Sequence, residues 1–144
     1  MKIFLLLVTV ISLAFSQTPY TLTKYKSIYP VVEIYTKKVP ISYKQKILQI
    51  MKEYTSELGI NTQGYSDRAL GILVTRVAVG EGLVLKVELL VGEDIKRLDD
   101  NEETFALTYQ KIDIFEVEEL EEDLIDSVEY LLEEFKNQYE EDNE

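Results

Sequence analysis

The last part of the chain constrains the fold most strongly, because its apolar residues recur along one stripe and charged residues fill the rest. The stripe consists of Leu120, Leu124, Val128, Leu131, Leu132, Phe135 and Tyr139, with Ile125 beside it. Residues three, four and seven positions apart share one face of an α-helix, so this spacing predicts an amphipathic helix. Such a helix must bury its apolar face against another element, which the rest of the chain has to supply.

Three extended segments in the middle of the chain are the natural candidates. The apolar residues of 83–91 alternate with Lys86 and Glu88, which is typical of a strand with one buried face. Comparable strands are expected at 70–79 and 104–117. A tight hairpin turn at 80–82 joins the first two, and a longer exposed loop at 92–103 joins the last two.

The apolar positions of the last expected strand do not keep one alternation. Phe105, Leu107 and Tyr109 share one parity, and Ile112 and Ile114 have the other. This change predicts a β-bulge near residues 110–111.

Upstream, residues 31–36 read as a strand that follows a proline, and a helix is expected to begin at Ser42. Ser42 and Gln45 have the spacing of a capping box, in which each side chain bonds the other residue's backbone N–H. Gly59 followed by Ile60 predicts a Schellman-type end for this helix. Its apolar face would comprise Ile47, Leu48, Met51, Tyr54 and Leu58.

Together these segments predict an α+β domain with the order β-α-β-β-β-α. We expect a two-layer sandwich, in which a mostly antiparallel four-stranded sheet packs against two amphipathic helices. The domain would span 17–139, and the acidic tail 140–144 would fray, because its negative charges lie at the wrong end of the helix dipole.

The first 16 residues predict a cleavable secretory signal. A lysine precedes the apolar stretch 3–15, which is shorter than the roughly 20 residues that span a bilayer. Ala14 and Ser16 place small residues where signal peptidase reads them, so cleavage would leave Gln17 as the first residue. The sequence contains no cysteine, which excludes a bacterial lipid anchor at the cleavage point and favours the periplasm, with an extracellular location as the alternative. We therefore expect no membrane anchor in the mature protein.

The net charge of −12 is concentrated at one end of the chain. Residues 116–144 contain 14 acidic residues and the single base Lys136, whereas the stretch 17–115 has equal numbers of acids and bases. This distribution argues against nucleic acid as a partner, because nucleic acid requires clustered lysine and arginine. Lysines of the first helix, Lys44, Lys46 and Lys52, could neutralise part of the acidic helix if the two helices are neighbours.

The side-chain inventory excludes several kinds of chemistry. Without histidine or cysteine, the chain cannot form a Ser-His-Asp or Cys-His catalytic site or the usual zinc sites. Carboxylates are too numerous for any one pair to indicate a catalytic site. An oxygen-rich stretch at 99–103 is a candidate for calcium, although it lacks the ligand spacing of an EF-hand. We expect no cofactor and no enzymatic activity.

What remains is a hypothesis of protein binding. The order of elements resembles, in topology only, small accessory domains of bacterial envelope assemblies. We expect a non-enzymatic exported domain that binds an envelope protein, either through its sheet surface or through an acidic helix face formed by Glu122, Asp126, Glu129 and Glu133. The alternatives are a periplasmic protein that binds calcium or a small molecule, and a carboxylate-based hydrolase of envelope sugars. The oligomeric state is left open.

Overall fold

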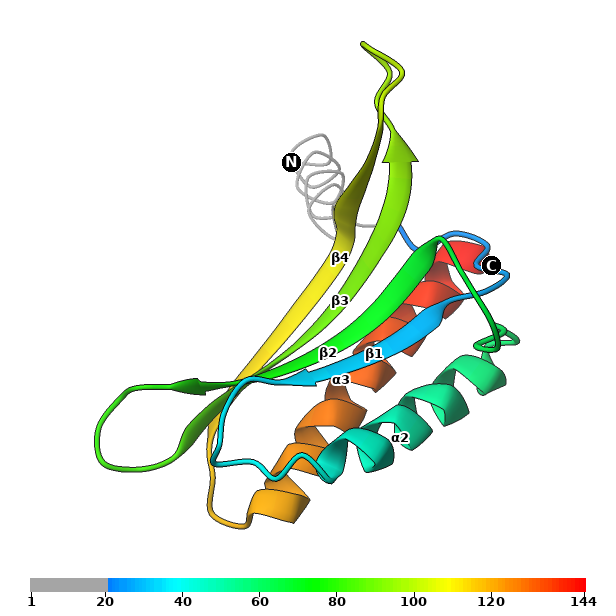
Figure 1. Ribbon diagram of the computed structural model, residues 1–144. Coiled ribbons are helices and arrows are strands. Elements are labelled where there is room, and N and C mark those ends of the chain that lie inside the picture. The colour runs from blue at the N-terminus through cyan, green and yellow to red at the C-terminus, as the bar shows by residue number, and fades with distance from the viewer. Residues whose placement is uncertain (1–20) are drawn as a thin grey trace, which may run out of the picture.

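The computed structural model describes residues 21–144, which form four strands and two helices (Figure 1). The proposed signal 1–16 and its cleavage residues Ala14, Ser16 and Gln17 lie outside the described residues. The elements are β1 (Tyr29–Ile34), α2 (Tyr43–Glu57), β2 (Arg68–Val77), β3 (Val84–Lys96), β4 (Glu103–Glu116) and α3 (Leu120–Asn143). The predicted α+β class and the order β-α-β-β-β-α are confirmed. Among the described residues, no helix is long and apolar enough to cross a membrane.

The four strands form one sheet in the order β1-β2-β3-β4. The β2–β3 and β3–β4 pairs are antiparallel, whereas β1 runs parallel to β2. Helix α2 makes the connection from β1 to β2, which a parallel pair requires because a tight hairpin cannot join parallel strands. The sheet is therefore mixed, with two antiparallel pairs and one parallel pair.

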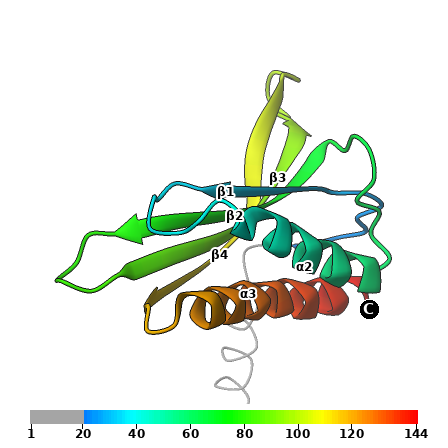
Figure 2. The same ribbon diagram turned by 60° about the horizontal axis from the view of Figure 1, so that its bottom comes forward.

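Both helices lie on the same face of the sheet (Figures 1 and 2). The buried strand residues alternate along β2 and β3, and the apolar stripe of α3 packs against them. The core includes Leu70, Ile72, Val74, Leu85, Val87, Leu89 and Val91 from the sheet, and Leu124, Val128, Leu131, Leu132 and Phe135 from α3. The opposite face of the sheet faces away from both helices.

The two ends of α2 differ in how well the sequence predicted them. The capping box at Ser42 is wrong: this residue has a helical backbone conformation and makes no side-chain cap. The carbonyl groups of Pro40 and Ile41 instead accept the first N–H groups of the helix, from Tyr43 and Lys44. The Schellman end is confirmed, because Gly59 has a φ of +70° and the N–H of Ile60 bonds the carbonyl of Thr55 at 2.9 Å.

The β3–β4 hairpin is longer than predicted, because strand pairing continues to Lys96 and Glu103. The predicted β-bulge is present, but it lies slightly earlier in the strand. Val91 pairs with Tyr109 and Gly92 with Leu107, so the extra residue is Thr108 and not one near 110–111. The change of apolar parity along β4 has the predicted cause, an inserted residue, because Leu107 before Thr108 and Ile112 after it lie on the same face of the sheet.

Residues 140–144, for which we expected fraying, are helical as far as Asn143. The side chains of Asp142 and Asn143 bond the segment that leads into β1. The Asp142 carboxylate accepts the N–H of Leu22 at 2.6 Å, and the Asn143 amide accepts the N–H of Lys24 and donates to the carbonyl of Leu22. These bonds hold the end of α3 against its unfavourable charge at the helix C-terminus.

Candidate functional site

The face of the sheet opposite the helices is apolar and open to solvent. Side chains of a strand alternate between faces, so the residues that alternate with the core positions belong to this open face. Its apolar members on β1 to β4 are Val31, Leu73, Leu90, Phe105, Leu107, Ile112 and Ile114. The four on β4 are between 47% and 59% exposed. We call these seven residues the open apolar face.

The bulge at Thr108 keeps the four β4 residues together. Phe105 and Leu107 lie before the bulge and Ile112 and Ile114 after it, and their positions in the sequence have opposite parity. Because one extra residue shifts the alternation by one, all four side chains reach the same face.

Phe105 is held on this face by a glycine in the neighbouring strand. A methyl group at Gly92 would overlap Cζ of the Phe105 ring, so the ring occupies the space that a side chain at position 92 would need. Such packing of an aromatic ring over a strand glycine stabilises the pairing of the two strands. Packing within the β3–β4 hairpin therefore fixes the position of Phe105 at the end of the open apolar face.

The centre of the face carries no net charge. Lys86 and Glu88 both lie there and pair with each other at 2.8 Å. Gln110, opposite Leu90 on β4, donates to the Glu88 carboxylate at 3.2 Å. These three polar side chains thus satisfy one another within the face, and the helices cover the opposite side of the sheet (Figure 2).

The free edge of β4, in contrast, is protected. On the side of β4 that faces the helices, Lys111 and Asp113 place charges beside the edge, and Lys111 pairs with Glu134 of α3 at 3.6 Å. Inward charges and a bulge are devices by which proteins prevent strand addition at an edge. Contact with another protein is therefore favoured at the face and disfavoured at this edge.

The predicted acidic face lies where the helical spacing placed it. Glu122, Asp126, Glu129 and Glu133 are all exposed on α3, and within the described residues none of them has an ion pair. The neighbouring helix neutralises other acids of α3. Lys46 bonds Glu121 at 2.6 Å, which raises the pKa of that lysine.

The other lysines of α2 do not contribute to α3 in the predicted way. Lys44 pairs with Glu33 of β1 at 2.9 Å, and Lys52 is exposed beside Glu53 and Glu57. A base on α3 itself completes the helix–helix contact, because Lys136 bonds Glu57 at 2.7 Å. The expected neutralisation between the helices is thus limited to Lys46.

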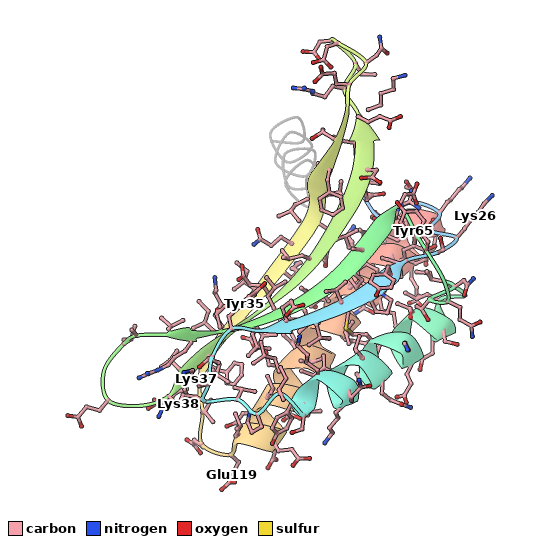
Figure 3. All side chains as sticks on the ribbon, in the orientation of Figure 1. Lys26, Tyr35, Lys37, Lys38, Tyr65 and Glu119 are labelled. Carbon is pink, nitrogen blue, oxygen red and sulfur yellow. The ribbon has the colours of Figure 1, made fainter. Side chains whose placement is uncertain are left out.

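Two shallow hollows flank the start of α3, and both contain Asp126. One has a volume of about 430 Å³ and is lined by Lys46, Glu119, Glu121, Glu122, Ile125 and Asp126. The other, about 290 Å³, lies between α3 and β4 and includes Asp113, Glu116 and Asp123. Asp123 accepts the N–H groups of Glu118 and Glu119 at 2.7 and 2.8 Å, so it caps the helix. Figure 3 shows Glu119 at this end of the molecule.

The oxygen-rich stretch 99–103 forms the tip of the β3–β4 hairpin. The Arg97 guanidinium pairs with both Asp100 and Glu102, and the Asp100 carboxylate also accepts the N–H of Glu102. These carboxylates are therefore occupied in shaping a turn. Among the described residues, no group of three or more acidic side chains is placed to hold a metal ion. Leu98, 99% exposed, is the outermost apolar side chain of the tip.

The tyrosines near the start of the chain divide between core and surface. Tyr25 is buried, with its ring 5.6 Å from that of Tyr139 and 4.5 Å from the guanidinium carbon of Arg68. Burial, assisted by the nearby Glu93 carboxylate, raises the pKa of Tyr25 to about 12. Tyr35 is 66% exposed and lies just after β1, close to Lys37 and Lys38 (Figure 3).

Taken together, the structure defines an α+β domain with one sheet face covered by helices and one apolar face open. Comparison by sequence finds no matching family model and no matching curated protein. Two solved structures are similar in outline. One is a dodecamer of a PelC point variant from Paraburkholderia phytofirmans, with 12% identity, a TM-score of 0.40, and coverage of 69% of this chain and 76% of that one. The other is a minor lipoprotein from Acinetobacter baumannii, with 13% identity, a TM-score of 0.37, and coverage of 81% and 91%. Both are too distant to bear on function.

Sequence reasoning named the residues of the acidic face, whereas it offered the sheet surface only in general and did not identify the residues of the open apolar face. The signal was present in the part of β4 after the bulge, where Tyr109 and Phe115 have one parity and Ile112 and Ile114 have the other. A strand that is apolar on both sides requires cover on both sides, and the helices supply it on one.

Proposed function

We propose that this protein is an exported, non-enzymatic accessory domain that binds protein through the open apolar face of its sheet. The observation that carries the proposal is the half-exposed row of Phe105, Leu107, Ile112 and Ile114 on one side of β4. Large contiguous apolar patches are rare on soluble monomers and mark interaction sites when they occur. The predicted signal 1–16 supports delivery to the periplasm, where an envelope protein would be the partner.

The acidic face of α3 is the second candidate surface. Its four exposed carboxylates, unpaired within the described residues, favour a basic partner and would steer its approach. Binding there would weaken with salt, whereas binding at the open apolar face would not. Reversing the charge at Glu122, Asp126 and Glu129 separates the two surfaces, because it leaves the sheet untouched.

The alternatives from other classes have less support. Calcium binding would need the carboxylates of 99–103, which already bond Arg97 and backbone N–H groups. A glycosidase would need two carboxylates facing each other across a substrate cleft with environments that separate their pKa values. The acids around α3 line shallow hollows, and one of them, Asp123, is engaged in capping.

The test is site-specific photo-crosslinking in the cells that express the protein. A photoreactive amino acid at Ile112 should give a discrete protein adduct. The same group at Ile41, which is also exposed but lies beside the start of α2, should give none. Adducts of equal yield at both positions, or at neither, would contradict the proposal.

Export is tested separately. Mass spectrometry of the protein released by osmotic shock should identify Gln17 as the first residue. Recovery only from the cytoplasm, with residues 1–16 intact, would contradict it.

A further inference from the structure

We infer that the partner on the open apolar face is a second copy of this chain, so that the protein is a dimer whose sheets pack face to face. The inference rests on the proposed function of this face and names its partner. It follows from three properties of the face: its charge, its size and the protection of the neighbouring edge.

Charge determines which surface two copies can bring together. Residues 116–144 carry a net charge of −13, and all of α3 lies within them. Two copies that approach through this helix repel each other. The open apolar face lies on the other side of the sheet (Figure 2), and its central pair, Lys86 and Glu88, is neutral. It is therefore the surface on which two strongly acidic copies can meet at the smallest electrostatic cost.

The size of the face suits a stable dimer. Strands lie about 4.8 Å apart and rise about 3.3 Å per residue, so each residue covers roughly 16 Å² of a sheet face. The paired region, with six residues from β1 and ten from β2 and their partners on β3 and β4, covers roughly 570 Å² in projection. Protruding side chains make the accessible area larger than the projection. The face thus approaches the roughly 800 Å² per partner that a stable protein interface buries.

The mode of contact is face to face. Pairing through β4 would have to overcome the bulge at Thr108 and the inward charges Lys111 and Asp113. The face has no comparable device, and Ile112 and Ile114 project directly from it. Two sheets that pack in this way lie about 10 Å apart, and under a twofold axis both copies contribute the same patch to the contact. Both acidic helices would then lie on the outer sides of the dimer.

Sedimentation equilibrium of the purified protein, from nanomolar to high micromolar concentration, tests the inference. We expect a monomer–dimer equilibrium for the mature chain, residues 17–144. The double substitution Ile112→Lys and Ile114→Lys should weaken it at least about 100-fold, because it places four like charges in the interface. The matched control is Ile41→Lys, the same substitution at a residue that is 66% exposed and outside the face. It should leave the dissociation constant unchanged.

Two variants with opposite charges at position 112 test whether loss of folding, and not charge repulsion, causes dissociation. Ile112→Lys and Ile112→Glu variants should each dissociate alone and associate when mixed, because both copies contribute the same patch to a twofold interface, so like charges enter it in each variant alone and opposite charges enter it in the mixture. A monomer at every concentration, or a dimer that persists in the double-lysine variant, would overturn the inference. If the chain is monomeric but position 112 still crosslinks to a different protein, self-association falls and the proposed function stands.

Discussion

Two glycines on the same face of the sheet should respond oppositely to the same substitution. At Gly71, an added Cβ meets nothing closer than Cδ1 of Leu73 at 3.4 Å, an ordinary contact. Gly71→Ala should therefore stabilise the fold by about 0.5–1 kcal/mol, because glycine loses the most conformational freedom when a strand forms. At Gly92, the added Cβ would require the Phe105 ring to leave its position.

The cost at Gly92 follows from what Phe105 buries. This ring is 58% exposed, so of the roughly 200 Å² of a phenylalanine side chain about 80 Å² is covered. Losing that burial costs about 2 kcal/mol at about 25 cal/mol per Å². The gain from alanine offsets part of it, which leaves a net loss of about 1–1.5 kcal/mol. Urea unfolding at a single protein concentration measures both variants.

A double-mutant cycle makes the reasoning refutable. In a Phe105→Ala background the clash is gone, so Gly92→Ala should become neutral or stabilising, as Gly71→Ala is. A loss of stability from Gly92→Ala that is the same with and without the ring would show that Phe105 is not the cause.

Three further outcomes follow from the core and the ends of the helices. Tyr139→Phe should lower the free energy of unfolding by about 1–3 kcal/mol in chemical denaturation, because the Tyr139 hydroxyl bonds the N–H and carbonyl of Tyr25 at 3.1 and 3.4 Å. The control is Tyr130→Phe at an exposed position, which should change this free energy by less than about 0.5 kcal/mol. Alkaline pH should destabilise the fold, since burial raises the pKa of Tyr25 to about 12 and also raises that of Tyr109. The contribution of these two tyrosines to stability is complete below the unfolded tyrosine pKa of about 10 and is lost as pH rises through their folded pKa values. Phenolate absorbance should therefore show tyrosines that titrate late. A single titration near 10 with retained structure would contradict this prediction. Gly59→Ala should cost about 1 kcal/mol in thermal or urea unfolding, because φ at this position is +70°, and an unchanged midpoint would refute that account of the helix end.

The elements could be predicted where the signal is local. The stripe of α3 follows from helical periodicity. The end of α2 follows from Gly59, because glycine is the residue type that adopts a positive φ without strain. The cap at Ser42 failed because backbone carbonyls of Pro40 and Ile41 already accept the first N–H groups of the helix. A side-chain motif in the sequence does not show whether its partners are already bonded.

The features that could not be predicted from the sequence depend on the tertiary arrangement of the elements. The parallel pairing of β1 with β2 depends on how α2 crosses the sheet, and the persistence of α3 to Asn143 depends on bonds to residues about 120 positions away. The open apolar face is of the same kind. Periodicity shows that β4 has two apolar sides, but only the packing shows which side the helices cover. The acidic face was predictable, because exposure on an amphipathic helix follows from the position of its apolar stripe.

The most direct test of the central claim is whether the open apolar face is covered in the protein in solution. Hydroxyl-radical footprinting reports the solvent exposure of individual side chains and can be repeated as the protein is diluted. The account predicts that Phe105, Leu107, Ile112 and Ile114 are protected at high concentration and react faster on dilution, while Leu98 and Ile41 react at one rate throughout. Rates for the four face residues that match their half-exposed state and do not change with concentration would contradict it.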